Sequence, residues 1–332
     1  MKSQEYGISI ISTGSYIPEE IETNEMLCKT LPDHITPDWI IQKTGIKSRR
    51  IATNITSSQM AINAAKIAIE KSNISINSIN LIICCTHSND YIFPAMSAKI
   101  MKEFALTNCQ VFDLQANCSG FVTGLTVASD RMFCENDIKY ALVIGVEKQS
   151  PFRDITDYNT SIYLSDGAGA AILSKVDSNF GILASSFHTD PSTYESVRLR
   201  GGGSSFTYKN RNFDPKIDYM EMNGLATWKQ AITNLPITIK STCKKASINV
   251  SDVDFFLFHQ ANMEMIKYIM GKLKIPLIKT HTNIETIGNT ASASVAIVLD
   301  EAINLGKVNK NQTIILASVG AGFIFGSSIW KI

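Results

Sequence analysis

The chain has 332 residues, of which 45% are hydrophobic and 18% are charged, and its formal net charge is +1. These values describe a well-packed globular protein with one large domain or two of ordinary size. A nearly neutral chain produces no overall field that would attract nucleic acid or an anionic membrane, so neither is an expected partner.

Cysteine usage and the N-terminus indicate a cytoplasmic protein. The seven cysteines are odd in number and form no C-x-x-C pair, which argues against a disulfide framework or a zinc site and favours a reducing compartment. The N-terminus is polar, unlike a signal peptide, and no apolar run approaches the roughly 20 residues that span a bilayer. We therefore expect a cytoplasmic localisation and no metal site.

Apolar β-type runs alternate with helical patterns along the chain, which predicts an α/β fold. Continuous apolar strands such as 81–85 and 140–146 indicate sheets that are covered on both faces. In the first half we predict strands at 7–13, 80–86, 110–115, 139–146 and 168–174, and helices near 56–72, 94–106 and 118–135. In the second half we predict strands at 180–188, 253–258, 312–318 and 323–331, and helices near 219–246, 261–273 and 289–304.

The two halves of the chain resemble each other. Segment 81–87 matches 255–261, the helix that begins at Cys118 matches the one at Thr290, and 141–146 matches 314–319, each at an offset of roughly 172–174 residues. This periodicity predicts a duplicated βα unit, with halves at 1–175 and 176–332. A duplicated fold brings equivalent element ends together at its pseudo-twofold axis.

Three polar side chains at element ends are candidate catalytic residues. Cys118 stands where the strand run 111–115 ends and a helical pattern begins, so the helix N–H groups and dipole are expected to lower the pKa of its thiol. His259 ends an apolar strand, and Asn289 begins another apolar helix. Each has a simpler interpretation, as an inert buried thiol, a carbonyl partner and an N-cap respectively. Their convergence on one cleft would favour catalysis.

The least regular stretch is 189–218, which is rich in basic residues and glycine. Its basic side chains on flexible backbone suit phosphate binding, and a solvated insertion without a ligand is an equally good interpretation. The residues concerned are Arg198, Arg200, Gly201–Gly203, Lys209, Arg211 and Lys216.

Six motifs in a fixed order carry a resemblance that runs almost end to end. They are Asp38-Trp39-Ile40 with Thr44-Gly45-Ile46 and Arg49-Arg50, Asp113-Leu114 with Cys118-Ser119-Gly120-Phe121, Asp166-Gly167-Ala168-Gly169-Ala170, His259-Gln260-Ala261-Asn262, Gly288-Asn289-Thr290, and Gly320-Ala321-Gly322-Phe323 with Gly326. Together they resemble β-ketoacyl-acyl-carrier-protein synthase III, one of the thiolase-like condensing enzymes. The resemblance implies a duplicated five-layer αβαβα fold and a homodimer.

The resemblance also implies a reaction and its substrates. Cys118 would take an acyl group from an acyl thioester, typically an acyl-CoA. His259 and Asn289 would bind the thioester carbonyl of malonyl-acyl-carrier protein and stabilise the enolate left by decarboxylation, giving a 3-oxoacyl thioester without a further cofactor. Backbone N–H groups of Cys118 and Ala321 would form a second oxyanion hole.

Further positions match the family's substrate-binding residues. Trp39, with Lys43 and Thr44 nearby, matches the aromatic residue that stacks on the CoA adenine. Phe93 matches a residue that the dimer partner inserts into the acyl pocket. The remaining matches, to pocket and tunnel walls, are Leu164, Met222, Gly224, Trp228 and Asn262.

Several positions depart from the family pattern. Lys43 and Tyr158 replace arginines that flank the adenine, Glu264 replaces an arginine that faces the carrier protein, and Ala321 replaces a glycine. Alanine resists a positive φ, and an acidic residue repels an acidic carrier. Lys267, Lys272 and Lys274 are expected to supply the basic patch instead. These departures predict a specialised pathway with a non-standard acyl donor or acceptor.

Three alternatives compete with a condensing enzyme. A papain-like cysteine hydrolase has the same Cys…His…Asn order, but its C-G-[SA]-C-[WY] signature is missing. An acyltransferase of the same fold would pass the acyl group to an alcohol or amine without decarboxylation. A non-catalytic partner subunit would have lost the cysteine, which this chain retains.

Overall fold

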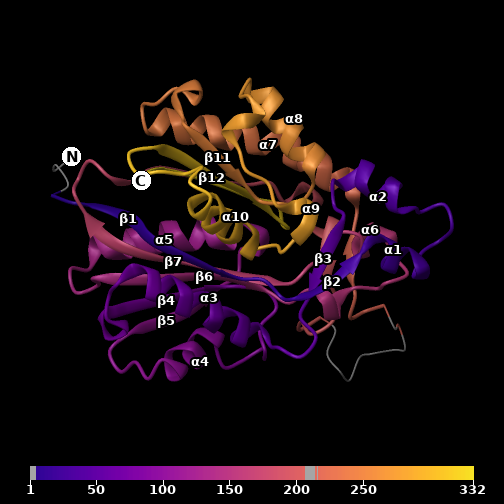
Figure 1. Cartoon of the computed structure of the whole chain (residues 1–332), viewed down its shortest axis with the longest axis horizontal. Coiled ribbons are helices and arrows are strands. Elements are labelled where there is room, and N and C mark those ends of the chain that lie inside the picture. The colour runs from indigo at the N-terminus through magenta and orange to yellow at the C-terminus, as the bar shows by residue number, and fades with distance from the viewer. Residues whose placement is uncertain (1–4, 206–213, 215) are drawn as a thin grey trace.

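The computed structural model describes residues 5–205, 214 and 216–332. Two β-sheets are stacked with helices between them and on both outer faces, so the molecule has the expected αβαβα layers (Figure 1). The order of layers follows from the sequence, because continuous apolar strands require cover on both sides. No helix of the described part is long and apolar enough to cross a membrane.

The first sheet has five strands in the order β1-β7-β6-β4-β5. The pairs β5–β4 and β4–β6 are parallel, whereas β6–β7 and β7–β1 are antiparallel. The carboxyl ends of β4, β5 and β6 therefore meet at one edge of the sheet. The bounds are β1 (Gly7–Tyr16), β4 (Ile79–Cys85), β5 (Gln110–Leu114), β6 (Tyr140–Glu147) and β7 (Gly167–Val176).

The second sheet repeats this arrangement with four strands in the order β8-β13-β12-β11. β11 pairs parallel with β12, and β13 pairs antiparallel with β12 and β8, as in the first sheet. The internal repeat predicted from the sequence is thus seen in the strand order. The division into halves at residue 175 stays a prediction. The strands are β8 (Gly181–Thr189), β11 (Phe255–Phe258), β12 (Thr313–Gly320) and β13 (Ile324–Lys331).

Two central helices, α5 (Gly120–Cys134) and α10 (Ala293–Asn304), lie between the sheets (Figure 1). Both are apolar on nearly all faces, as a helix buried on every side must be. Close packing depends on a glycine of β7: a Cβ at Gly169 would lie 2.5 Å from the Cβ of Ala296 on α10. The outer layers are α3 (Ser57–Ser72) and α4 (Met96–Glu103) on one side, and α7 (Gly224–Lys245) and α8 (Met263–Leu273) on the other.

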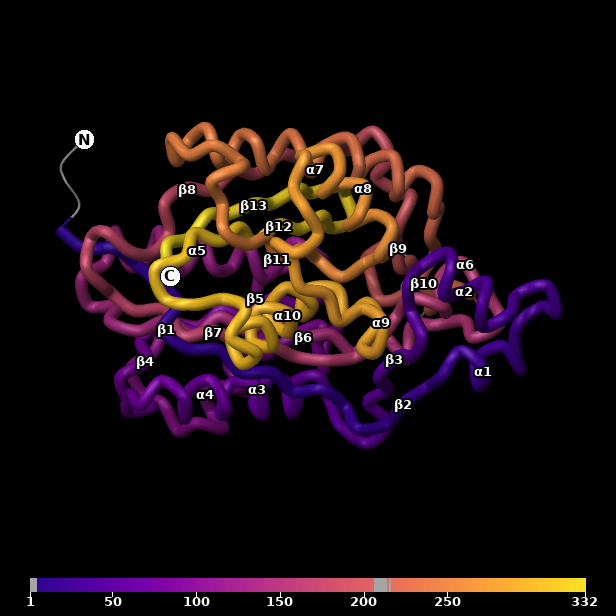
Figure 2. The backbone as a smooth tube through the Cα atoms, turned by 45° about the horizontal axis from the view of Figure 1, so that its top comes forward, coloured from indigo at the N-terminus to yellow at the C-terminus, as the bar shows by residue number. Residues whose placement is uncertain are grey.

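The smaller elements gather at one end of the molecule, and the sequence analysis did not predict them (Figures 1 and 2). β9 and β10 form a two-stranded antiparallel ribbon, so the predicted helix near 219–246 is wrong in its first residues. α7 instead begins at Gly224, where Asn223 caps it by accepting the N–H of Ala226. The elements are β2 (Glu20–Thr23), α1 (Asn24–Leu27), α2 (Pro37–Thr44), β3 (Ser48–Ile51), α6 (Tyr158–Ser161), β9 (Val197–Leu199), β10 (Met220–Met222) and α9 (Ile284–Ile287).

Candidate active site

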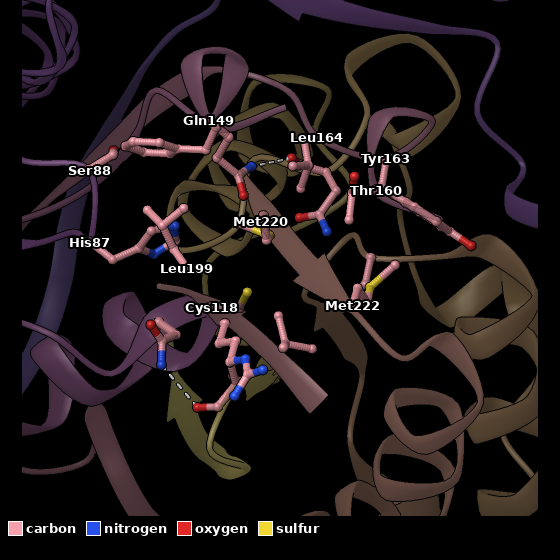
Figure 3. A pocket seen from close by; sticks show the side chains of 18 of the residues that line it. His87, Ser88, Cys118, Gln149, Thr160, Tyr163, Leu164, Leu199, Met220 and Met222 are labelled. Carbon is pink, nitrogen blue, oxygen red and sulfur yellow. Dashed lines mark hydrogen bonds between the residues drawn. The ribbon is translucent and has the colours of Figure 1, made fainter. Parts of the chain in front are cut away.

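A cavity of about 760 Å³ lies where the strand ends of the two halves face each other. Cys118, His259 and Asn289 all line it, although they come from distant parts of the chain. Its wall also includes the β9–β10 ribbon, which contributes Leu199, Met220 and Met222 (Figure 3). Figure 3 shows the Cys118 sulfur directed into the space that these side chains enclose.

Cys118 lies in a 3₁₀ turn (Asn117–Ser119) between β5 and α5, so it precedes the helix rather than beginning it. The turn is fixed to the second half of the chain. Ser318 Oγ donates to the carbonyl of Cys118 at 2.6 Å, and Asn117 Nδ2 donates to the carbonyl of Ala321 at 2.9 Å. Gly320 must be a glycine here, because a Cβ would lie 2.6 Å from the carbonyl oxygen of Ala116.

The expected low pKa of the Cys118 thiol is wrong. Burial, together with the negative charge of Glu147, raises the pKa of Cys118 to about 12, and only its own backbone N–H opposes this. The dipole argument from the sequence omitted the low-dielectric surroundings and the buried carboxylate. The resting nucleophile is therefore a neutral thiol, and its proton must be removed when it reacts.

His259 follows β11 and presents an imidazole with a defined partner. Its Nδ1 lies 2.6 Å from Ser294 Oγ, and the same oxygen accepts the N–H of Gln260 at 3.3 Å. Because this oxygen already accepts one hydrogen bond, its own proton is available to Nδ1, which leaves the ring proton on Nε2. Burial lowers the pKa of His259 to about 4, so the ring is neutral near pH 7.

Asn289 is fixed by two hydrogen bonds, one from its backbone N–H and one to its side-chain oxygen. Its N–H donates to the carbonyl of Tyr163 at 2.9 Å, and its Oδ1 accepts the N–H of Ala291 at 2.9 Å. With Oδ1 engaged in this way, the side-chain NH₂ is the group left to donate. His259 and Asn289 together can supply two neutral hydrogen-bond donors to an oxyanion in the cavity.

The other predicted site residues divide into two groups by position. Leu164, Met222, Gly224, Trp228, Asn262 and Ala321 line the cavity. Trp39, Lys43, Thr44 and Phe93 are not among the lining residues. Thr44 is completely buried, and its hydroxyl donates to the carbonyl of Ile40 at 2.7 Å. A contact between Thr44 and a substrate stays a prediction.

Asn262 lines the cavity, but its side chain already has structural partners. Its Oδ1 accepts the N–H groups of Glu264 and Met265 and so caps α8, while its Nδ2 donates to the carbonyl of Lys43 at 2.9 Å. The residue joins the start of α8 to the end of α2. A contact between Asn262 and a substrate stays a prediction.

Comparisons with known proteins show the family to which the chain belongs. The family model described as 3-Oxoacyl-[acyl-carrier-protein (ACP)] synthase III matches residues 112–191, and the model of its C-terminal part matches residues 243–332. The β-ketoacyl-[acyl-carrier-protein] synthase III of Clostridium botulinum (strain 657 / Type Ba4) is 37% identical over 331 residues, which cover 98% of this chain and 99% of that protein. The chain belongs to the β-ketoacyl-[acyl-carrier-protein] synthase III family.

Solved structures of the synthase III family share the whole fold. The 3-oxoacyl-[acyl-carrier-protein] synthase III from Aquifex aeolicus VF5 matches with a TM-score of 0.90 at 32% identity, covering 98% of this chain and all (100%) of that one. The priming β-ketosynthase from a polyketide biosynthetic pathway matches with a TM-score of 0.91 at 26% identity, covering 100% of this chain and 98% of that one. The thiolase-like fold expected from the motifs is confirmed.

The departures from the synthase III pattern have specific structural outcomes. Ala321 has no positive φ, so the alanine adds no backbone strain there, and the positive φ in this loop belongs to Gly322 at 130°. Tyr158 packs edge-on against Trp39 with ring centroids 5.9 Å apart, and Lys43 Nζ lies 6.0 Å from the centroid of the Trp39 ring. Glu264 pairs with Lys267 at 2.7 Å, which offsets its negative charge.

The basic stretch at 189–218 does not present free cations where it is described. Arg198 pairs with Glu195 and Glu221, each at 2.8 Å, and Arg200 pairs with Asp214 and Glu221. Their charges are therefore offset by nearby carboxylates, which argues against phosphate binding. The stretch is not simply a solvated insertion either, because Arg198 and Gly201–Gly203 line the cavity. Lys209 and Arg211 lie outside the described residues.

Sequence reasoning missed two ionisable residues beside Cys118. His87 lines the cavity two residues after β4, and Glu147 is the buried last residue of β6. A signal existed, since His87 closely follows one buried apolar strand and Glu147 ends another. Their adjacency depends on the strand order, which the sequence did not provide. No group of side chains in the described ranges is suited to hold a metal ion.

Proposed function

We propose that this chain is a condensing enzyme of the synthase III type, in which Cys118 carries the acyl group and malonyl-acyl-carrier protein supplies the extending unit. The observation that carries the proposal is the meeting of Cys118, His259 and Asn289 in one cavity of a chain from this family. The product is a 3-oxoacyl thioester on the carrier protein.

The first half-reaction is acyl transfer to Cys118. The sulfur attacks the carbonyl carbon of an acyl thioester, typically an acyl-CoA, the bond to the CoA sulfur breaks, and the thiol proton passes to the departing thiolate. Backbone N–H groups of Cys118 and Ala321 are proposed to bind the oxyanion. The fixed turn supports this role, because Gly320 allows the two segments to approach closely.

The second half-reaction is decarboxylation and carbon–carbon bond formation. When malonyl thioester loses CO₂, negative charge develops on its thioester oxygen, and the His259 and Asn289 donors are proposed to stabilise it. Neutral donors suit this step, since they stabilise the enolate without protonating it, and removing one such donor typically costs about 10²–10³ in rate. The enolate carbon then attacks the acyl carbonyl, and Cys118 leaves.

The acyl chain is proposed to occupy the apolar part of the cavity. Leu164, Leu199, Met220 and Met222 provide an apolar wall, and the last three belong to the β9–β10 ribbon (Figure 3). A dry pocket favours decarboxylation and protects the acyl-enzyme from water. Methionine side chains adapt to differently shaped ligands, so this wall suits a non-standard acyl group.

The CoA and carrier-protein contacts are proposed outside the cavity. Trp39 is partly exposed and offers a stacking surface for adenine, with Lys43 above it as a cation for phosphate. Lys267 is half exposed at the start of α8, although Glu264 offsets its charge. An acidic carrier is therefore expected to meet a weaker basic patch here than in family members with an arginine at position 264.

A cytoplasmic homodimer is also part of the proposal. Phe93 is 82% exposed and Ile92 is 80% exposed, an unusual state for two adjacent apolar residues. β5 is an edge strand whose residues are only partly buried. Both features support association with a second copy, in which Phe93 would enter the partner's acyl pocket.

The test is an acyl-donor screen followed by the intact mass of the protein. We expect a set of acyl-CoAs to leave one acyl group on the wild type and none on Cys118→Ala. Adding malonyl-acyl-carrier protein to the acyl-enzyme should remove the adduct and release one CO₂ for each 3-oxoacyl product. Ester or amide formation without CO₂ would favour the acyltransferase, and no adduct with any donor would contradict the proposal.

A further inference from the structure

The cavity contains a second imidazole at the end of a neighbouring strand. β4 pairs parallel with both β5 and β6, so the residues that follow these strands meet at one sheet edge. His87 follows β4, Cys118 follows β5, and Glu147 ends β6. Strand order alone therefore brings a thiol, an imidazole and a carboxylate together.

His87 and Glu147 form a close pair. His87 Nδ1 lies 3.0 Å from Glu147 Oε1, and the side-chain exposures are 14% and 0%. The carboxylate is fixed by hydroxyl donors, with Ser88 Oγ and Ser292 Oγ each at 2.7 Å. A carboxylate held in this way orients the ring and favours the tautomer with the proton on Nδ1.

Both ring nitrogens of His87 are buried and make no hydrogen bond of good geometry among the described residues, although Nδ1 lies 3.0 Å from Glu147 Oε1. The His87 side chain lines the cavity that holds Cys118. In Figure 3 the His87 ring and the Cys118 sulfur are directed into the same space. A buried nitrogen without a partner is costly unless it serves a ligand or a reaction.

The chemistry of Cys118 requires such a base. Its thiol is neutral at rest, because burial and Glu147 raise its pKa to about 12. His259 is poorly suited to take the proton, since burial lowers its pKa to about 4. For His87, burial disfavours the imidazolium, but the Glu147 carboxylate outweighs this effect and raises its pKa. A neighbouring base oriented by a third group is the usual way to activate a thiol.

We propose that His87, oriented by Glu147, is a further catalytic residue of this pocket, which takes the Cys118 thiol proton during acyl transfer and gives it to the leaving thiolate. The Sγ–H bond breaks as Nε2 accepts the proton and Sγ bonds to the acyl carbon. The bond from that carbon to the donor sulfur then breaks, and the imidazolium protonates this sulfur. No oxidant or additional reactant is needed. This role rests on the proposed function of Cys118 as the acyl acceptor.

The first experiment follows acylation of Cys118 by intact mass at saturating acyl-CoA. We expect His87→Gln to slow acylation about 100-fold or more, which is the usual contribution of a general base. Decarboxylation of malonyl-acyl-carrier protein should change less than about twofold, since His259 and Asn289 remain. His188→Gln is the matched control, because His188 is exposed and stacks on Phe325 outside the cavity.

A second readout separates a catalytic role from a structural one. His87→Ala leaves space for free imidazole, which should restore acylation at least tenfold, whereas imidazole should not accelerate the wild type. Acylation of His87→Gln at the wild-type rate would overturn the inference. So would equal loss of acylation and decarboxylation in a folded variant with no rescue, because this result indicates a structural effect.

A third experiment distinguishes failure of the proposed function from failure of the His87 role. Iodoacetamide alkylates the Cys118 thiol without an acyl donor, and we expect its rate at the Cys118 peptide to fall at least tenfold in His87→Gln at pH 7. If wild type and variant are alkylated equally, the role of His87 is wrong even if Cys118 is acylated. If wild type is alkylated faster but accepts no acyl group, the proposed function fails while His87 remains the base for the thiol.

Discussion

The two imidazoles of the cavity follow corresponding strands of the duplicated fold, yet their partners differ. His87 follows β4 and faces the carboxylate of Glu147, whereas His259 follows β11 and faces the hydroxyl of Ser294. The carboxylate raises the pKa of His87 despite burial, and burial without a nearby anion lowers the pKa of His259 to about 4. The His87 ring can therefore accept a proton near pH 7, whereas the His259 ring stays neutral and can only donate a hydrogen bond.

The difference shows how a duplicated fold can give one residue type two roles. The histidines are offset along these strands, since the match of 81–87 with 255–261 aligns His259 with Cys85 and His87 with Ala261. The neighbouring strand supplies Glu147 to His87, and the central helix supplies Ser294 to His259. Acyl transfer needs a base, whereas decarboxylation needs donors that do not protonate the enolate. The account therefore assigns His87 to the first half-reaction and His259 to the second.

The largest expected effect is at His259. His259→Ala should slow decarboxylation of malonyl-acyl-carrier protein about 10²–10³-fold, because the enolate loses one of its donors. Acylation of Cys118 should change less than about threefold. The two rates are measured by CO₂ release and by intact mass, with Asn289→Ala as a companion variant. Loss of acylation to the same extent would break the comparison.

The pH profiles of the two half-reactions should differ in form. Acylation requires neutral His87, so its rate should fall about tenfold per pH unit below the pKa of His87, which lies above the ordinary 6.5. Decarboxylation requires neutral His259 and should stay flat down to about pH 5. Parallel profiles between pH 5 and 8 would contradict the assignment. Besides His87, the titratable or charged side chains that line the cavity are Tyr91, Asp113, Cys118, Tyr163, Arg198 and His259, and Glu147 pairs with His87.

A smaller effect is expected from the hydroxyl partner of His259. Ser294→Ala should slow decarboxylation about tenfold, because the imidazole loses the hydrogen bond that fixes its tautomer. Acylation is expected to keep its wild-type rate. Thermal unfolding serves as a control for packing, since Ser294 is buried on α10. An unchanged rate of CO₂ release in a folded variant would show that the ring needs no such support.

The smallest effect on a reaction rate is expected at Ser88, which donates a hydrogen bond to Glu147 and so supports His87 indirectly. Ser88→Ala removes a 2.7 Å hydrogen bond to the carboxylate but leaves the donor Ser292 in place. We expect acylation to slow about threefold and decarboxylation to stay constant, consistent with one net hydrogen bond of about 1 kcal/mol. The comparison with Ser294→Ala is direct, because each serine supports one imidazole. A slower decarboxylation in Ser88→Ala would count against the separation of roles.

The sequence predicted the repeat and the three central residues because both depend on local patterns. Apolar periodicity located the long strands and helices, and the motifs around Cys118, His259 and Asn289 carried the resemblance. The β9–β10 ribbon was missed because each strand is only three residues long and pairs across an insertion. The side chains of β10 were read as part of the following helix, and β9 fell in the stretch 189–218 that was predicted to be irregular.

Properties that depend on neighbouring strands could not be predicted. The pKa of Cys118 is controlled by burial and by Glu147 on β6, so the local helix argument had the wrong sign. The pairing of His87 with Glu147 could not be predicted for the same reason, because the two residues follow or end different strands. Thr44 matched a family position, but its hydroxyl is used within α2. For Cys118 and His87 the missing information was a contact between segments distant in the chain.

The most direct test measures both half-reactions in His87→Gln and His259→Ala side by side. Acylation is followed by the mass of the protein at saturating acyl-CoA, and decarboxylation by CO₂ release from malonyl-acyl-carrier protein. We expect His87→Gln to be slow only in acylation and His259→Ala to be slow only in decarboxylation. If both variants lose the same half-reaction, the two imidazoles share one role and the account is contradicted.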